Sequence, residues 1–103
     1  MGGDGSQKRI QWDIEVKLYL KQAIQFIRQE SPQGADIVKR TLLEHVVALK
    51  RNAEIYEVDR FKLDNDGSYK AFTVYNYRIT YRVTPNRILI LRLRHTSQDP
   101  IIY

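Results

Sequence analysis

Three β-rich segments near the carboxyl end constrain the fold of this chain more than any other feature. Tyr, Thr, Ile and Val dominate these segments, as is typical of pleated strands: residues 69–74, 77–83 and 88–95. Only Tyr75-Asn76 and residues 84–87 separate them, and Asp64-Asn65-Asp66-Gly67 predicts a turn just before the first. Short connections join antiparallel neighbours, so the pattern predicts a β-meander with one face to be buried.

Two amphipathic helices precede the meander. Apolar residues recur at spacings of three and four, which indicates a helix with one buried stripe: Val16, Leu20, Ala23 and Ile27, then Ala35, Val38, Leu42, Val46 and Leu49. Asp13 is placed to cap the first helix, which we expect to end near Glu30. Ser31-Pro32 then starts the second helix, which we expect to end near Lys50. A short strand is predicted at residues 8–12.

The order β-α-α-β-β-β predicts an α+β fold, in which a helical hairpin packs on one face of a small twisted antiparallel sheet. We expect a single domain over residues 8–103, preceded by a flexible N-terminal lead at residues 1–7. The pattern leaves three points open. They are an extra strand or helical turn within residues 51–66, the register of residues 69–74, and the structure of the tail after His95.

The predicted register of the last hairpin gathers arginines on one face of the sheet. A three-residue loop at residues 85–87 turns two sets of side chains toward the core: Tyr77, Ile79, Tyr81 and Val83, and Leu89, Leu91, Leu93 and His95. An even loop would instead turn the leucines to the arginine side. With the odd loop, the opposite face carries Ile90, Thr80 and the residues that we term the arginine face: Arg78, Arg82, Arg92 and Arg94.

This register has an electrostatic consequence. Arg78 lies directly across from Arg94, and like charges in that position destabilise a sheet. An anion from a ligand or partner would offset the repulsion. The alternative is that the arginines turn into solvent and lay their stems over Ile90.

Positive charge is concentrated in the same region. Residues 1–67 hold eleven Lys and Arg against eleven Asp and Glu, whereas residues 68–103 hold six against one, and the net charge is +5. Five of those six cations are arginines, whose rigid fork of donors suits phosphate or carboxylate groups. The pattern fits either a solvated basic face or an anionic partner, namely nucleic acid or an acidic protein segment.

Composition excludes or disfavours several kinds of chemistry. The chain has no cysteine, which rules out a disulfide, a thiolate nucleophile and a cysteine-ligated zinc site, and its two histidines disfavour any metal site. No apolar stretch approaches the roughly 20 residues that a bilayer requires. We therefore expect a cytoplasmic protein that needs no metal or cofactor and does not insert into a membrane.

The residues present are compatible with metal-independent cleavage of RNA by its own ribose 2′-hydroxyl. That reaction needs a base, an acid and cations around the phosphate. His95, Tyr103 and Lys70, together with the arginine face, could supply these groups. Their spacing permits the reaction without singling it out.

The last three segments resemble toxins of the RelE/ParE superfamily. The run from Gly67 to Val83 contains the motifs G-S-Y-K and Y-R-I-T-Y-R-V, and residues 88–95 read I-L-I-L-R-L-R-H. Their order and spacing are similar to those of the superfamily, and the resemblance covers about residues 8–103. It implies the toxin of a type II toxin–antitoxin pair, held in a hetero-oligomer by an antitoxin whose partly disordered, acidic segment meets the basic sheet.

The resemblance implies one of two mechanisms. ParE-like toxins inhibit DNA gyrase, whereas RelE-like toxins cleave mRNA on the ribosome. Arg78 and Lys70 match basic residues of the RelE-like nucleases, but Phe72 stands where a second lysine is usual. His95 matches a histidine found in several nuclease branches, and Tyr103 aligns only loosely with a terminal tyrosine.

The long helical hairpin favours the ParE-like branch, so we expect a gyrase inhibitor. An mRNA endonuclease is the alternative, and a non-toxic binding module of the same fold is the third possibility. The residues expected to bind the anionic target or the antitoxin are Lys70, Arg78, Arg82, Arg92 and Arg94. Those expected to act in catalysis, if the protein is a nuclease, are Arg78, His95 and Tyr103.

Overall fold

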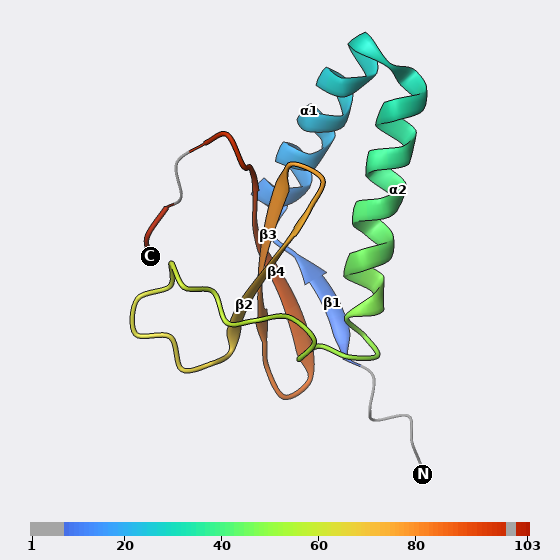
Figure 1. The fold of residues 1–103 in the computed structure, drawn as a ribbon. Coiled ribbons are helices and arrows are strands. Elements are labelled where there is room, and N and C mark those ends of the chain that lie inside the picture. The colour runs from blue at the N-terminus through green and yellow to red at the C-terminus, as the bar shows by residue number, and fades with distance from the viewer. Residues whose placement is uncertain (1–7, 99–100) are drawn as a thin grey trace.

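The computed structural model describes residues 8–98 and 101–103, and this part of the chain forms two helices and four strands (Figure 1). In chain order they are β1 (Arg9–Trp12), α1 (Ile14–Glu30), α2 (Pro32–Ala48), β2 (Tyr69–Val74), β3 (Tyr77–Val83) and β4 (Arg87–His95). The predicted α+β class and β-α-α-β-β-β order are therefore confirmed. The predicted flexible lead at residues 1–7 lies outside the described residues.

Both helices begin where their capping residues predict. The Asp13 carboxylate accepts a hydrogen bond from the Glu15 N–H (2.8 Å), and the Ser31 hydroxyl accepts one from the Gly34 N–H (2.9 Å). These bonds satisfy amide groups that the first turn of a helix leaves unpaired. Pro32 at the first position of α2 keeps the link short, so the helices form a hairpin (Figure 1). Neither helix of the described chain is long and apolar enough to cross a membrane.

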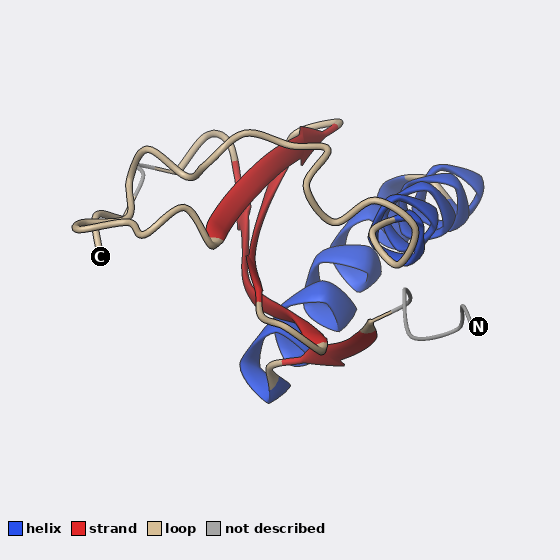
Figure 2. Cartoon of the chain, turned by 90° about the horizontal axis from the view of Figure 1, so that it is seen from below, coloured by secondary structure: helices blue, strands red, loops and turns tan. Residues whose placement is uncertain are grey.

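β2, β3 and β4 form the predicted antiparallel meander, and β1 joins its far edge. The strand order is β1-β4-β3-β2, and β1 runs parallel to β4, so the sheet is mixed rather than wholly antiparallel. The helical hairpin lies on one side of the curved sheet, and the C-terminal tail lies on the other (Figure 2). The two faces therefore meet different surroundings.

The register of β3 and β4 shifts between Thr80 and Tyr81. At the open end of this hairpin the predicted register is confirmed, and Arg78 pairs with Arg94. Toward the loop the register moves by one residue, so Ile90, predicted on the arginine face, is fully buried on the helix side. The predicted three-residue loop is therefore wrong. Four residues lie between Val83 and Ile88, the last residues that pair before the loop. The bulge accommodates the one residue by which this loop exceeds the predicted three.

The core lies between the sheet and the hairpin. Ile88 and Ile90 occupy the places predicted for Leu89 and Leu91, which are only half-buried. Tyr81 is fully buried, and its hydroxyl donates a hydrogen bond to a backbone carbonyl beyond α2 (2.9 Å). The other buried apolar residues of the core include Val16, Leu42, Val46, Leu49, Phe72, Val74, Tyr77, Ile79 and Leu93.

The segment between α2 and β2, left open by the sequence pattern, consists of turns and one isolated β-bridge, between Val58 and Lys70. The Asp59 N–H donates to the Tyr69 carbonyl oxygen (2.8 Å), and this bond helps to fix the segment along the edge of β2. Neither an additional helix nor a full strand forms in the described residues of this segment. Its main effect is to carry the Asp59 side chain onto the arginine face.

Candidate functional site

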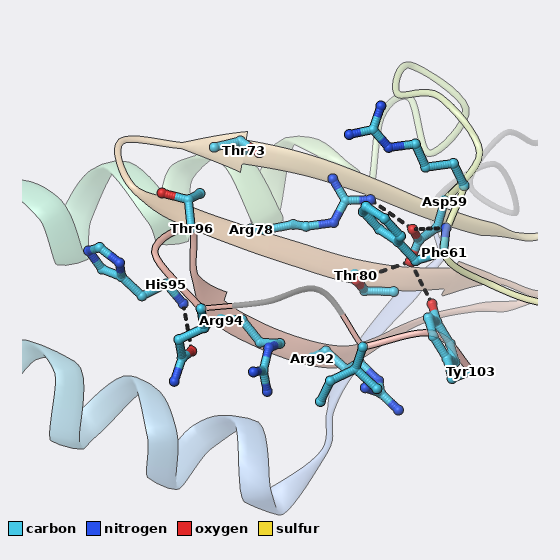
Figure 3. Close-up of a pocket in the computed structure, with 13 residues that line it drawn as sticks. Asp59, Phe61, Thr73, Arg78, Thr80, Arg92, Arg94, His95, Thr96 and Tyr103 are labelled. Carbon is cyan, nitrogen blue, oxygen red and sulfur yellow. Dashed lines mark hydrogen bonds and ion pairs between the residues drawn. The ribbon is translucent and has the colours of Figure 1, made fainter.

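A cavity of about 230 Å³ lies on the face of the sheet that carries the arginines (Figure 3). β2, β3 and β4 contribute its floor, and Asp59, Phe61 and Tyr103 form one end. We term it the arginine cavity. Its lining residues are Asp59, Arg60, Phe61, Thr73, Arg78, Thr80, Arg92, Arg94, His95, Thr96, Gln98, Ile101 and Tyr103.

A buried carboxylate organises one end of this cavity. Asp59 is 2% exposed, and one of its oxygens, Oδ1, accepts hydrogen bonds from the Arg78 guanidinium (2.7 Å) and the Phe61 N–H (3.0 Å). The other oxygen, Oδ2, accepts a bond from the Tyr103 hydroxyl (2.7 Å) and a longer one from the Thr80 hydroxyl (3.4 Å). Asp59 therefore ties β3 and the tail to the same point.

These contacts keep Asp59 ionised. Burial by itself would raise the pKa of Asp59, but the hydrogen bonds from the Phe61 N–H, Tyr103 and Arg78 outweigh it and lower the pKa from its ordinary value of 3.8. Burial, and then the hydrogen bond to Asp59, raise the pKa of the Tyr103 hydroxyl. Tyr103 is consequently a hydrogen-bond donor in this cavity rather than a base.

Asp59 also changes the interpretation of the arginine pair. We expected an external anion to offset the repulsion between Arg78 and Arg94, but the protein supplies a carboxylate of its own to Arg78. No pattern in residues 51–66 marks Asp59 for this role. Its partners come from β3 and the tail, which only the folded chain brings together, so sequence reasoning missed it.

Aromatic rings hold two of the arginines. The Arg92 guanidinium lies 4.3 Å from the centre of the Tyr103 ring, and the Arg78 guanidinium lies 5.0 Å from the centre of the Phe61 ring. Cations are attracted to the faces of aromatic rings at such distances. The cavity thus presents guanidinium groups in fixed positions.

Two residues expected to bind an anion do not line the cavity. Arg82 lies on the arginine face, but its guanidinium packs over the Tyr69 ring (4.8 Å) and donates to the Ser68 hydroxyl (3.1 Å). Lys70 lies on the helix side of β2, where its ammonium group forms an ion pair with Glu54 (3.2 Å) and its side chain is 9% exposed. Arg82 therefore stays on the same face as the other arginines, whereas Lys70 lies on the opposite face of the sheet.

His95 contributes to one end of the cavity, but its ring extends away from Arg78 and Tyr103 (Figure 3). The ring packs edge-on against Tyr77, with 5.2 Å between the ring centres. Its Nδ1 atom accepts a hydrogen bond from the Ser97 N–H (3.0 Å) and lies 2.7 Å from the Ser97 hydroxyl oxygen. Of the three residues expected to act in catalysis, the structure brings Arg78 and Tyr103 together but not His95.

The cavity is better equipped to hold an anion than to transfer a proton. The carboxylate of Asp59 is buried and bound by four donors, and the Tyr103 hydroxyl is held protonated. Among the described residues, no three His, Cys, Asp or Glu side chains gather so that they could hold a metal ion. Fixed guanidinium groups remain as the main chemical feature.

A second hollow lies on the helical hairpin. It measures about 530 Å³ and has an apolar floor to which Trp12, Leu20 and Leu43 contribute. We term it the hairpin groove. Its polar rim contains Gln25 and four cations, Lys17, Lys21, Arg28 and Lys39. No carboxylate belongs to the described residues that line it.

Comparison with models of protein families gives a match over most of the chain. A family model described as the ParE toxin of type II toxin–antitoxin systems, parDE, matches residues 10–100. The match spans both helices and all four strands except the first residue of β1. A search among curated proteins found no match.

Proposed function

The chain belongs to the ParE family of toxins from type II toxin–antitoxin systems, and on that premise we propose that it arrests growth by inhibiting DNA gyrase. The family implies a cognate antitoxin as its partner. We assign the contact with gyrase to the arginine cavity.

The placement of three side chains supports this function over RNA cleavage. The His95 ring extends away from Arg78 and Tyr103, while both of the latter are bound to Asp59 (Figure 3). A general base works best when its pKa is close to the operating pH, and the environment of Tyr103 moves its pKa away from that range. Fixed arginines suit a contact surface, because little side-chain freedom is lost when they bind.

Ribosome-dependent cleavage of mRNA is the second candidate. It is favoured by the fact that Arg78, His95 and Tyr103 all line one cavity. A rearrangement that turned His95 toward the cavity would bring together the groups that the reaction requires. A non-toxic binding module is the third candidate, and it differs from both toxins in predicting no growth arrest.

For the antitoxin, the hairpin groove offers a better fit than the basic sheet that the sequence suggested. Arg78 and Arg82 of the sheet already have carboxylate partners, Asp59 and Asp66, from the segment between α2 and β2. The groove combines an apolar floor with a cationic rim, which suits an amphipathic segment with acidic residues along its edges. We therefore propose that an acidic amphipathic segment of the antitoxin docks there.

Two assays together test the proposed target. DNA and protein synthesis are followed by pulse labelling after induced expression in a bacterial host, and the purified protein is added to a gyrase supercoiling reaction. We expect DNA synthesis to fall first and supercoiling to be inhibited. A fall in protein synthesis within minutes, with DNA synthesis continuing, would indicate mRNA cleavage instead. Normal growth would indicate a non-toxic module.

The variant His95→Ala separates the two toxin mechanisms further. A nuclease that uses His95 should lose orders of magnitude in rate. A gyrase inhibitor should lose less than about tenfold, since one peripheral contact is usually worth little. His45→Ala is the matched control, because His45 lies on α2, where its ring bonds to the Thr41 carbonyl oxygen.

A further inference from the structure

The turn between β2 and β3 holds a tyrosine in an unfavourable backbone conformation. Val74 pairs with Tyr77, so Tyr75 and Asn76 form a two-residue turn. Tyr75 has a φ of 53°, and Asn76 is not among the residues with positive φ, which is the pattern of a type II′ turn. Glycine normally takes the first position of that turn, and a bulky residue there is strained.

Nothing around the Tyr75 side chain repays this strain. The residue is 55% exposed, and within the described chain its side chain forms no hydrogen bond and no ring contact. All the other aromatic residues except Phe26 are buried or half-buried. Glycine at position 75 would make the fold more stable, because it adopts this conformation without strain. The presence of a tyrosine there therefore needs an explanation other than stability.

The tip of this turn adjoins the arginine cavity. Thr73, two residues before Tyr75 on β2, lines the cavity, and so does Thr96, whose N–H donates to the Asn76 carbonyl oxygen (2.8 Å). That bond braces the turn against the end of β4. The exposed ring and the fixed guanidinium groups therefore belong to one continuous surface.

We propose that Tyr75 is a contact residue for the protein that this toxin inhibits, so that the turn and the arginine cavity form one recognition surface. The inference rests on the proposed function. Strain is tolerated at recognition sites because the residue is retained for binding and not for stability. Tyrosine is also among the residue types that contribute most to protein interfaces.

A protein partner fits this surface better than a single nucleic acid strand. Strand-binding surfaces stack successive bases on several open aromatic rings. Here the other two aromatic residues of the surface, Phe61 and Tyr103, already carry guanidinium groups over their rings. One isolated ring beside a basic cavity suits a partner that offers a pocket flanked by acidic groups.

Three variants test the proposal: Tyr75→Gly, Tyr75→Phe and Asp64→Gly. Asp64 is the matched control, because it is the other described non-glycine residue with positive φ (51°) and carries no ring. Both glycine variants should keep the fold, and relief of strain should raise the melting temperature of Tyr75→Gly by about 4 °C. Tyr75→Gly should need about tenfold more protein to arrest growth or inhibit supercoiling. Asp64→Gly should match the wild type, and Tyr75→Phe should lie between the two.

Several outcomes would overturn the inference. Tyr75→Gly could be as toxic as the wild type, or it could melt at a lower temperature, in which case the ring serves the fold. Loss of single-stranded RNA binding in Tyr75→Gly, without loss of any protein contact, would contradict a protein partner. If the wild type arrests growth without affecting gyrase, the proposed target fails, and Tyr75 is judged on growth arrest alone. If the wild type does not arrest growth, both proposals fail.

Discussion

Among the described residues, the arginine cavity and the hairpin groove carry equal numbers of Lys and Arg side chains but hold them in different ways. The cavity has Arg60, Arg78, Arg92 and Arg94, and the groove has Lys17, Lys21, Arg28 and Lys39. In the cavity, Asp59 and two aromatic rings fix guanidinium groups. In the groove, Arg28 alone among the four cations has an ion pair within the described chain, with Asp36, and the lysines surround apolar side chains.

The two surfaces should therefore draw their binding energy from different interactions. A fixed guanidinium loses little freedom when a partner binds, so the cavity selects by geometry. A lysine on a flexible stem attracts a partner from a distance, and that attraction is screened by salt. At the groove, the apolar floor must therefore supply most of the affinity. The two surfaces should respond differently to mutation.

The largest expected effect comes from removing the carboxylate of the cavity. Asp59→Ala leaves Arg78 and Tyr103 without their shared partner, and loss of one member of a buried ion pair is strongly destabilising. We expect a loss of about 3 kcal/mol in the free energy of unfolding, measured by urea denaturation. Glu57→Ala, in the same segment but exposed, is the control. A loss below about 1 kcal/mol for Asp59→Ala would show that the cavity does not depend on its carboxylate.

A charge placed in the groove should act on the antitoxin. Leu20→Glu puts a carboxylate into the apolar floor, where it meets the acidic antitoxin segment that we propose. Affinity for the antitoxin should fall about thirtyfold, or about 2 kcal/mol, in a calorimetric titration. Leu18→Glu, on the same helix but exposed and outside the groove, serves as control. Equal losses in both variants would place the antitoxin elsewhere.

Removal of one fixed arginine should have a smaller effect on toxicity. Arg92→Ala takes away a guanidinium held over Tyr103, and we expect about tenfold weaker inhibition of supercoiling. Arg87→Ala changes the charge equally, but Arg87 is exposed at the start of β4 and bonds to Gln11 (3.0 Å). If both variants lose the same activity, net charge and not the cavity explains it.

The smallest effect concerns pH. Because the folded state lowers the pKa of Asp59, ionised Asp59 stabilises the fold at pH values above its ordinary pKa of 3.8. That contribution disappears as the pH falls further, through the lowered pKa. Thermal unfolding between pH 6 and 2, as a rough range, should show a steeper acid loss in the wild type than in Asp59→Asn. Parallel curves would mean that Asp59 titrates alike in the folded and unfolded states.

The helices and strands could be predicted because their signals are local. Asp13 and Ser31 cap the helices through residues two or three positions away, and the strands show a change in composition at each turn. The burial of Ile90 could not be predicted, since the bulge that turns it inward lies within the pairing of β3 with β4 and leaves no local signal in the sequence. The argument from an odd or even number of loop residues predicted the wrong face for Ile90.

The candidate site was predicted only in part for the same reason. The arginines could be assigned to one face by alternation, and Arg78 was correctly paired with Arg94. Asp59, which fixes Arg78, comes from a segment without periodicity, and its contacts to β3 and the tail are set by tertiary structure. Lys70 could not be placed, because its register depended on a strand whose pairing the sequence left open.

The parallel pairing of β1 with β4 has a consequence for synthesis of the toxin. Of the four described strands, β1 is synthesised first, but its partner strand in the sheet, β4, is synthesised last. Contacts between distant parts of a chain form slowly, because a long loop must close before they contribute. The complete sheet, and with it the end of β4 that lines the arginine cavity, should therefore form only after β4 has been synthesised. Until then the arginine cavity is incomplete, which leaves time for an antitoxin made alongside the chain to be present when the fold closes.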